Sequence, residues 1–182
     1  MVGHFLHAEN SMFLIIDLQE KLMKKMKYSN MVYENTILFT NLCKLLDIPI
    51  AVTEQYPKGL GCTAAPIADE LGLFQPLEKI SFSACTEDIL DELRKYNRRQ
   101  ILVAGSETHI CVFQTVRDLL ASGFEVYILS DAVCSRFKNN YKNGIRLMER
   151  EGAIITDTET AIYDLLKEAG TPEFKAMLPL IK

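Results

Sequence analysis

The chain has 182 residues, of which 48% are hydrophobic and 24% charged, an ordinary balance for one domain that buries a sizeable core. A formal net charge of −4 gives no general attraction to nucleic acid, and the small basic cluster KLMKKMK at 21–27 does not reverse that sign. No apolar run approaches the roughly 18 to 20 residues of a membrane span. We therefore expect a single domain over 1–182, with no nucleic-acid partner and no membrane association.

The N-terminal sequence and the cysteines bear on location. The start, MVGHFLHAENS, has neither the basic flank nor the long apolar stretch of a secretory signal. The five cysteines are an odd number, are widely spaced and form no C-x-x-C pair. They are typical of reduced thiols, so we expect a cytoplasmic protein, with a mitochondrial location left open, and no zinc or other metal site.

Short β-rich apolar runs alternate with segments of helical spacing along the chain. The expected strands are 12–17, 48–53, 78–81, 101–105, 125–130 and 153–156, and the expected helices are 31–46, 86–96, 108–122 and 140–151. The strands show no internal polar alternation, which indicates burial on both faces. The sequence therefore predicts a three-layer α/β/α domain, with a six-stranded parallel sheet in the Rossmann-like order 3-2-1-4-5-6.

In such sheets ligands bind beyond the carboxyl ends of the strands, where the strand order reverses. Asp17 ends the first strand, Lys79 lies near the third, and Cys111 follows the fourth in ILVAGSETHIC. Taken singly, Asp17 could cap a helix, Lys79 could be a surface lysine and Cys111 could fill the core. The order 3-2-1-4-5-6 makes the first and fourth strands neighbours, so Asp17 and Cys111 should face each other across a crevice.

These three residue types form a complete set for nucleophilic catalysis. A helix N-terminus and a nearby lysine lower the pKa of a thiol and can hold an oxyanion. A carboxylate can accept the thiol proton and return it to a leaving group. His109 could be proposed as the base instead, but residues two apart on a helix point in different directions, so we interpret it as a pocket or interface residue.

Other nucleotide and hydrolase motifs do not occur in the sequence. DLQEKL follows the first strand where a dinucleotide fold needs glycines, and neither a G-x-x-x-x-G-K-[ST] loop nor a G-x-S-x-G elbow is present. We expect no cofactor.

The sequence resembles the isochorismatase-like cysteine hydrolases from about Phe13 to Ala161. The resemblance rests on FLIIDLQ, EKISFSAC and VAGSETHICVFQTVRDLLASGFEVYILSDAVCSR, and VTEQYPKGLG is most similar to the isochorismatase domain-containing subgroup. It implies an Asp17–Lys79–Cys111 triad, with Cys111 as nucleophile, Asp17 as base and Lys79 polarising thiolate and substrate. It also implies a cis peptide at Ser106–Glu107 and an oxyanion hole made by the N–H groups of Glu107 and Cys111. The residues implied to line the substrate pocket are Gln19, Gln55, Tyr56, Phe82 and Thr108.

Two departures narrow the expected activity. The Asp-x-His metal motif of nicotinamidases is replaced by TEQYPKGLG, and no arginine is evident in the segments assigned to the pocket. We therefore expect a cofactor-independent hydrolase of a small polar amide, carbamoyl or related compound, and a homo-oligomer, since the apolar tail FKAMLPLIK offers a docking segment. A catalytically silent binding or interaction protein with the same fold is the alternative.

Overall fold

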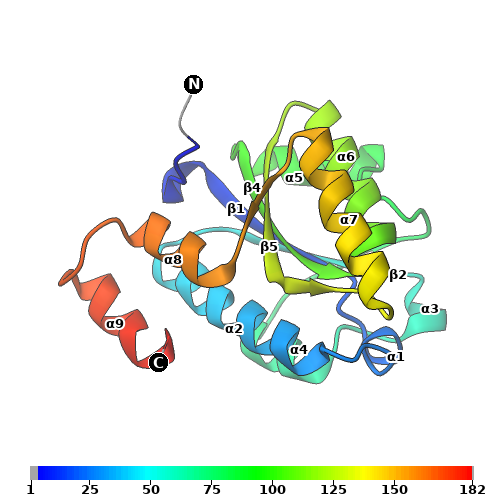
Figure 1. The fold of residues 1–182 in the computed structure, drawn as a ribbon, viewed down its shortest axis with the longest axis horizontal. Coiled ribbons are helices and arrows are strands. Elements are labelled where there is room, and N and C mark those ends of the chain that lie inside the picture. The colour runs from blue at the N-terminus through cyan, green and yellow to red at the C-terminus, as the bar shows by residue number, and fades with distance from the viewer. Residues whose placement is uncertain (1–3, 182) are drawn as a thin grey trace.

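The computed structural model describes residues 4–181, and its centre is a six-stranded parallel sheet between two layers of helices (Figure 1). The strand order is β3-β2-β1-β4-β5-β6, and every neighbouring pair is parallel. The predicted fold class and strand order are confirmed. The strands are β1 (Ser11–Ile16), β2 (Ile50–Gln55), β3 (Leu77–Lys79), β4 (Gln100–Ser106), β5 (Glu125–Cys134) and β6 (Ile154–Thr156).

The central strand β1 is buried on both faces, which explains its uninterrupted apolar sequence. Phe13 and Ile15 belong to the core on one side of the sheet, while Leu14 and Ile16 belong to the core on the other. Phe13 meets Phe39 of a covering helix edge to face, with ring centroids 4.8 Å apart.

Helices α2, α4, α8 and α9 cover one face of the sheet, and α5, α6 and α7 cover the other (Figure 1). The bounds are α1 (Glu20–Met23), α2 (Ser29–Leu45), α3 (Pro57–Leu60), α4 (Ala65–Leu71), α5 (Glu87–Lys95), α6 (Phe113–Ala121), α7 (Lys138–Glu151), α8 (Thr158–Leu166) and α9 (Pro172–Ile181). Thr86 caps α5, as the sequence predicted, by accepting a hydrogen bond from the N–H of Ile89. No helix within residues 4–181 is both long and apolar enough to cross a membrane.

Two predicted segments differ from the structure. The run 108–122 is not one α-helix, because a π-helical turn, Thr108–Val112, precedes α6. The fifth strand continues four residues past the predicted end at residue 130. A bulge makes this possible: the partner of β4 jumps from Ile128 at Val103 to Val133 at Gly105, so Ser130 and Asp131 interrupt the apolar run without ending the strand.

Candidate active site

A buried ion pair joins two of the three predicted catalytic residues. Asp17 directly follows β1 with a left-handed backbone (φ 52°), and Lys79 is the last residue of β3. The Lys79 Nζ lies 2.6 Å from the Asp17 Oδ2, and neither side chain is exposed to solvent. The pair spans two strand positions, because β2 lies between β1 and β3.

Side chains of β2 and backbone carbonyls satisfy the rest of this pair. The Thr53 hydroxyl donates to the Asp17 Oδ1 at 2.7 Å, and the Lys79 Nζ donates to the Gln55 Oε1 at 2.8 Å. Lys79 also donates to the carbonyl of Phe82 at 3.1 Å. Hydrogen bonds of this kind allow two opposite charges to remain buried.

Cys111 lies in the π-helical turn that follows β4, and it is buried. The N–H groups of Ile110 and Val112 both donate to the carbonyl of Glu107, at 2.9 and 3.3 Å, and among residues 4–181 the N–H of Cys111 does not share that acceptor. The turn around Cys111 is therefore wider than an α-helical turn, and the Glu107 carbonyl bonds the N–H groups on either side of Cys111.

The resting thiol is not the activated thiolate that the sequence suggested. Burial, which is the largest cause, and the charge of Asp17 raise the pKa of Cys111, Lys79 lowers it, and together they bring it to about 12. Lys79 lowers the pKa as expected, but burial outweighs it, so the pKa is raised where the sequence predicted a lowered one.

The peptide bond between Ser106 and Glu107 is cis, as expected, and Glu107 is held by an arginine that the sequence analysis overlooked. The Arg136 Nε lies 3.0 and 3.1 Å from the two carboxylate oxygens of Glu107, and the Arg136 N–H donates to the Oε2 at 2.9 Å. Glu107 is buried and Arg136 is half exposed. Arg136 follows the end of β5, at the same sheet edge as the other site residues, and that position is the signal that could have revealed it.

Both ring nitrogens of His109 are engaged by residues other than Cys111. Its Nδ1 lies 3.0 Å from the Ser135 Oγ, and its Nε2 lies 3.1 Å from the Asn140 Nδ2. An amide nitrogen can only donate, so Nε2 accepts and Nδ1 carries the proton. With both ring nitrogens occupied, His109 has no free nitrogen for a dyad with Cys111.

The five residues predicted to line the pocket fall into two groups. Tyr56 and Phe82 expose 51% and 56% of their surface at the rim of the site. Gln19, Gln55 and Thr108 are buried. The Gln19 amide bonds the Gln55 backbone at 2.8 and 3.0 Å and the Gly61 carbonyl at 2.6 Å, so it fixes the loop after β2. The Thr108 hydroxyl is buried without a partner.

Two glycines let neighbouring elements approach the site closely. A Cβ at Gly105, at the end of β4, would lie 2.4 Å from the carbonyl oxygen of Ile16, just before Asp17. A Cβ at Gly144, in α7, would lie 2.8 Å from the carbonyl oxygen of Thr108. The first contact brings the ends of β1 and β4 together, and the second places α7 directly against the turn that contains Cys111.

Residues 11–160 match the family described as "Isochorismatase domain". The chain belongs to the isochorismatase family. Isochorismatase family protein 1A of Dictyostelium discoideum is 37% identical over 180 residues, which cover 96% of this chain and 87% of that protein.

Solved structures of isochorismatase-fold proteins agree with this membership. The structure titled MAR1 ribonuclease from Caenorhabditis elegans superimposes with a TM-score of 0.91 and 35% identity, covering 98% of this chain and 92% of that one. A protein of Escherichia coli, titled an octameric hydrolase of unknown specificity, shares the fold at a TM-score of 0.90 and 18% identity, covering 100% and 91% of the two chains. Within the described part of this isochorismatase-family chain, no three His, Cys, Asp or Glu side chains cluster closely enough to hold a metal ion.

Proposed function

We propose that the chain is a cofactor-independent cysteine hydrolase that cleaves an amide, carbamoyl or related bond of a small polar metabolite through a covalent adduct on Cys111. One observation carries the proposal. The Asp17 carboxylate interacts with the Lys79 ammonium and the Cys111 thiol together, at the carboxyl edge of the sheet. A base held between a cation and a neutral thiol is the arrangement that general-base activation of a nucleophile requires.

The proposed reaction proceeds in two halves. As the Cys111 sulfur bonds to the substrate carbonyl carbon, its proton passes to Asp17, and the carbonyl π electrons move to oxygen. When this oxyanion collapses, the C–N or C–O bond breaks, and the leaving group takes the proton from Asp17. Water then attacks the resulting thioester, Asp17 removes a proton from that water, and the proton returns to sulfur as Cys111 leaves. Lys79 is the ion-pair partner of Asp17, and the residues need no cofactor for these transfers.

The oxyanion is proposed to lie against the N–H groups of Glu107 and Cys111. The ion pair with Arg136 supports this role, because it fixes the buried Glu107 side chain and with it the attached backbone. Backbone donors that are already oriented cost no reorganisation when charge develops. Gln19, Gln55 and Thr108 would shape the buried part of the pocket, with Tyr56 and Phe82 closing its rim.

The test is turnover of a panel of small amides, carbamoyl compounds and esters, with intact-mass analysis of the protein during turnover. We expect hydrolysis by the natural sequence, loss of hydrolysis in Cys111→Ser, and an adduct confined to the peptide that contains Cys111. Cys85→Ala is the matched control, because Cys85 is also a free and partly buried thiol. Hydrolysis that survives in Cys111→Ser would refute the covalent mechanism.

Two other functions are distinguished by the same variant. The Caenorhabditis elegans relative is titled a ribonuclease, so cleavage of a labelled RNA that disappears in Cys111→Ser would assign RNA as the substrate. Binding of a ligand without turnover, by both the natural sequence and Cys111→Ser, would instead support the catalytically silent alternative.

The Escherichia coli neighbour is titled octameric, and we propose a homo-oligomer here too, which sedimentation velocity tests. The cytoplasmic location stays a prediction.

A further inference from the structure

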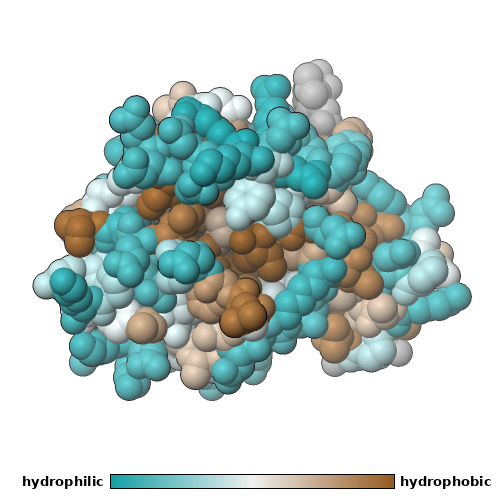
Figure 2. Space-filling view, turned by 180° about the vertical axis from the view of Figure 1, so that it is seen from behind, coloured by the Kyte–Doolittle hydropathy of each residue, from teal (hydrophilic) through white to brown (hydrophobic). Residues whose placement is uncertain are grey.

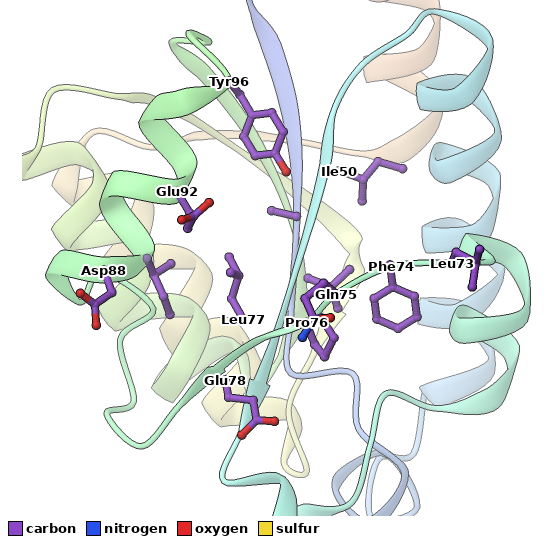
Figure 3. Close-up of a pocket in the computed structure, with 13 residues that line it drawn as sticks. Ile50, Leu73, Phe74, Gln75, Pro76, Leu77, Glu78, Asp88, Glu92 and Tyr96 are labelled. Carbon is purple, nitrogen blue, oxygen red and sulfur yellow. The ribbon is translucent and has the colours of Figure 1, made fainter.

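We propose that a groove beside the edge strand β3 is a docking site for an extended segment of another protein, in which lysine or arginine alternates with apolar residues. This groove, of about 780 Å³, is the large pocket drawn in Figure 3, and it contains none of the predicted catalytic residues. The inference is independent of the proposed hydrolase activity.

The groove has an apolar floor and one exposed apolar wall. Ile50 of β2 and Leu77 of β3 line the floor, and Leu73 and Phe74 lie on the wall opposite α5 (Figure 3). Leu73 is fully exposed, at 106% of its reference surface. The molecular face seen in Figure 2 likewise carries hydrophobic side chains in a hollow below a hydrophilic rim. Apolar surface of this kind is typical of interaction sites.

The charges on the groove all have one sign. Asp88 and Glu92 of α5 and Glu78 of β3 line it, and none of its thirteen lining residues is basic. Glu92 pairs with Lys95, one turn further along α5, while neither Asp88 nor Glu78 has an ion-pair partner among residues 4–181. Charge complementarity therefore selects a cationic occupant.

The spacing of the two α5 carboxylates selects an extended occupant. Asp88 and Glu92 are four residues apart, so they lie on one face of the helix with about 6 Å between their Cβ atoms. Alternate side chains of an extended chain are about 6.6 Å apart and point the same way, and the residues between them point to the opposite side. Basic side chains of such a segment would face α5, and apolar ones would face Leu73 and Phe74.

The position of β3 in the sheet leaves room for this segment. β3 is an end strand, and no strand lies beyond it within the described chain. The chain's own basic cluster at 21–27 is a poor occupant from a second copy, because it forms α1 and turns rather than an extended segment. A different protein is therefore the proposed partner.

The probe is a fluorescein-labelled peptide, KVKVKVK, titrated with the full-length protein at low salt and followed by fluorescence anisotropy. We expect binding, and a loss of about ten-fold or more in affinity in the double variant Asp88→Asn/Glu92→Gln. The matched control is Glu87→Gln/Asp91→Asn, which removes the same charge from exposed positions of α5 that do not line the groove. Its affinity should change by less than about two-fold. Leu73→Ser should weaken binding as well.

Four results would overturn the proposal. The first is that KVKVKVK does not bind, and the second is that the two double variants weaken its binding equally. The third is that KKKKVVV, in which the two residue types do not alternate, binds as tightly as KVKVKVK. The fourth is that spermidine displaces the labelled peptide completely when both are present at the same concentration. A dimer of the free protein that dissociates in Asp88→Asn/Glu92→Gln would assign the groove to a second copy instead. Amide chemical-shift changes on β3 and α5, and not around Cys111, would support the proposed location.

Discussion

Substitution of Gly144 by alanine probes the contact between α7 and the nucleophile's turn. The new Cβ would lie 2.8 Å from the carbonyl oxygen of Thr108 and 3.0 Å from the His109 nitrogen. Both are backbone atoms, so the turn must retreat by about 0.6 Å to reach ordinary contact. Overpacking of this kind costs about 1–3 kcal/mol, and alanine regains about 1 kcal/mol of helix propensity. We expect the free energy of unfolding to fall by about 0–2 kcal/mol.

The same retreat should affect catalysis more than stability. Cys111 lies in the displaced turn, and misplacement of a reacting group by about 1 Å can reduce a rate by about 100-fold. We therefore expect hydrolysis, or adduct formation at Cys111, to slow by about 10- to 100-fold in Gly144→Ala. Urea unfolding and the initial rate on the best panel substrate measure the two effects. The control Asn143→Ala places alanine at an exposed neighbouring position and should leave both nearly unchanged. If Gly144→Ala is more stable and keeps its rate, the steric argument is refuted.

Three further predictions concern charges near the site. Lys79→Met leaves the Asp17 carboxylate buried without its partner, so the free energy of unfolding measured in urea should fall by about 3–5 kcal/mol. Adding Asp17→Asn should recover part of this loss. No recovery would mean that lost packing, and not the unpaired charge, causes the destabilisation. Arg136→Gln should lower the free energy of unfolding by about 1–3 kcal/mol and slow turnover. Arg136→Lys should not restore the rate, because both side-chain contacts with Glu107 come from the Arg136 Nε, and lysine has a methylene group at that position. Burial raises the pKa of Cys134 to about 12, so the folded state favours the neutral thiol. The stability that this preference contributes is fully present below about pH 9 and is lost as the pH rises toward 12, by up to about 1.4 kcal/mol per pH unit. Urea unfolding at pH 8 to 11 should show a shallower decline in Cys134→Ala, and an equal slope would contradict the assignment.

The fold was predictable because its signal is local and repeated. Each buried strand is a short run such as ILVAG, and the parallel order follows from the alternation of strands with helices. Because the carboxyl ends of parallel strands meet at one edge of the sheet, Asp17, Lys79 and Cys111 could be predicted to lie near one another without any knowledge of their contacts. α8 was missed although Asp157 caps it by accepting from the N–H of Thr160, a signal that the sequence did contain.

What could not be predicted depends on distances and burial. Arg136 and Glu107 are 29 residues apart, and no spacing rule pairs them. The π-helical turn around Cys111 has no periodic pattern of its own, so the run from 108 looked like a continuous helix. The direction of the Cys111 pKa shift is a balance of burial, Asp17 and Lys79, and sequence discloses the charges but not the loss of water.

The raised pKa of Cys111 changes the role that we assign to Lys79 in its ion pair with Asp17. If the thiol were ionised at rest, Lys79 would serve mainly as its counter-ion, and Asp17 beside it would be a repulsive neighbour. With a neutral thiol, Lys79 is instead the ion-pair partner of Asp17, the proposed base. Asp17→Asn separates the two views. It removes a charge that raises the Cys111 pKa, so alkylation by iodoacetamide should become faster in the variant while hydrolysis is lost. An unchanged alkylation rate together with retained hydrolysis would favour the counter-ion role.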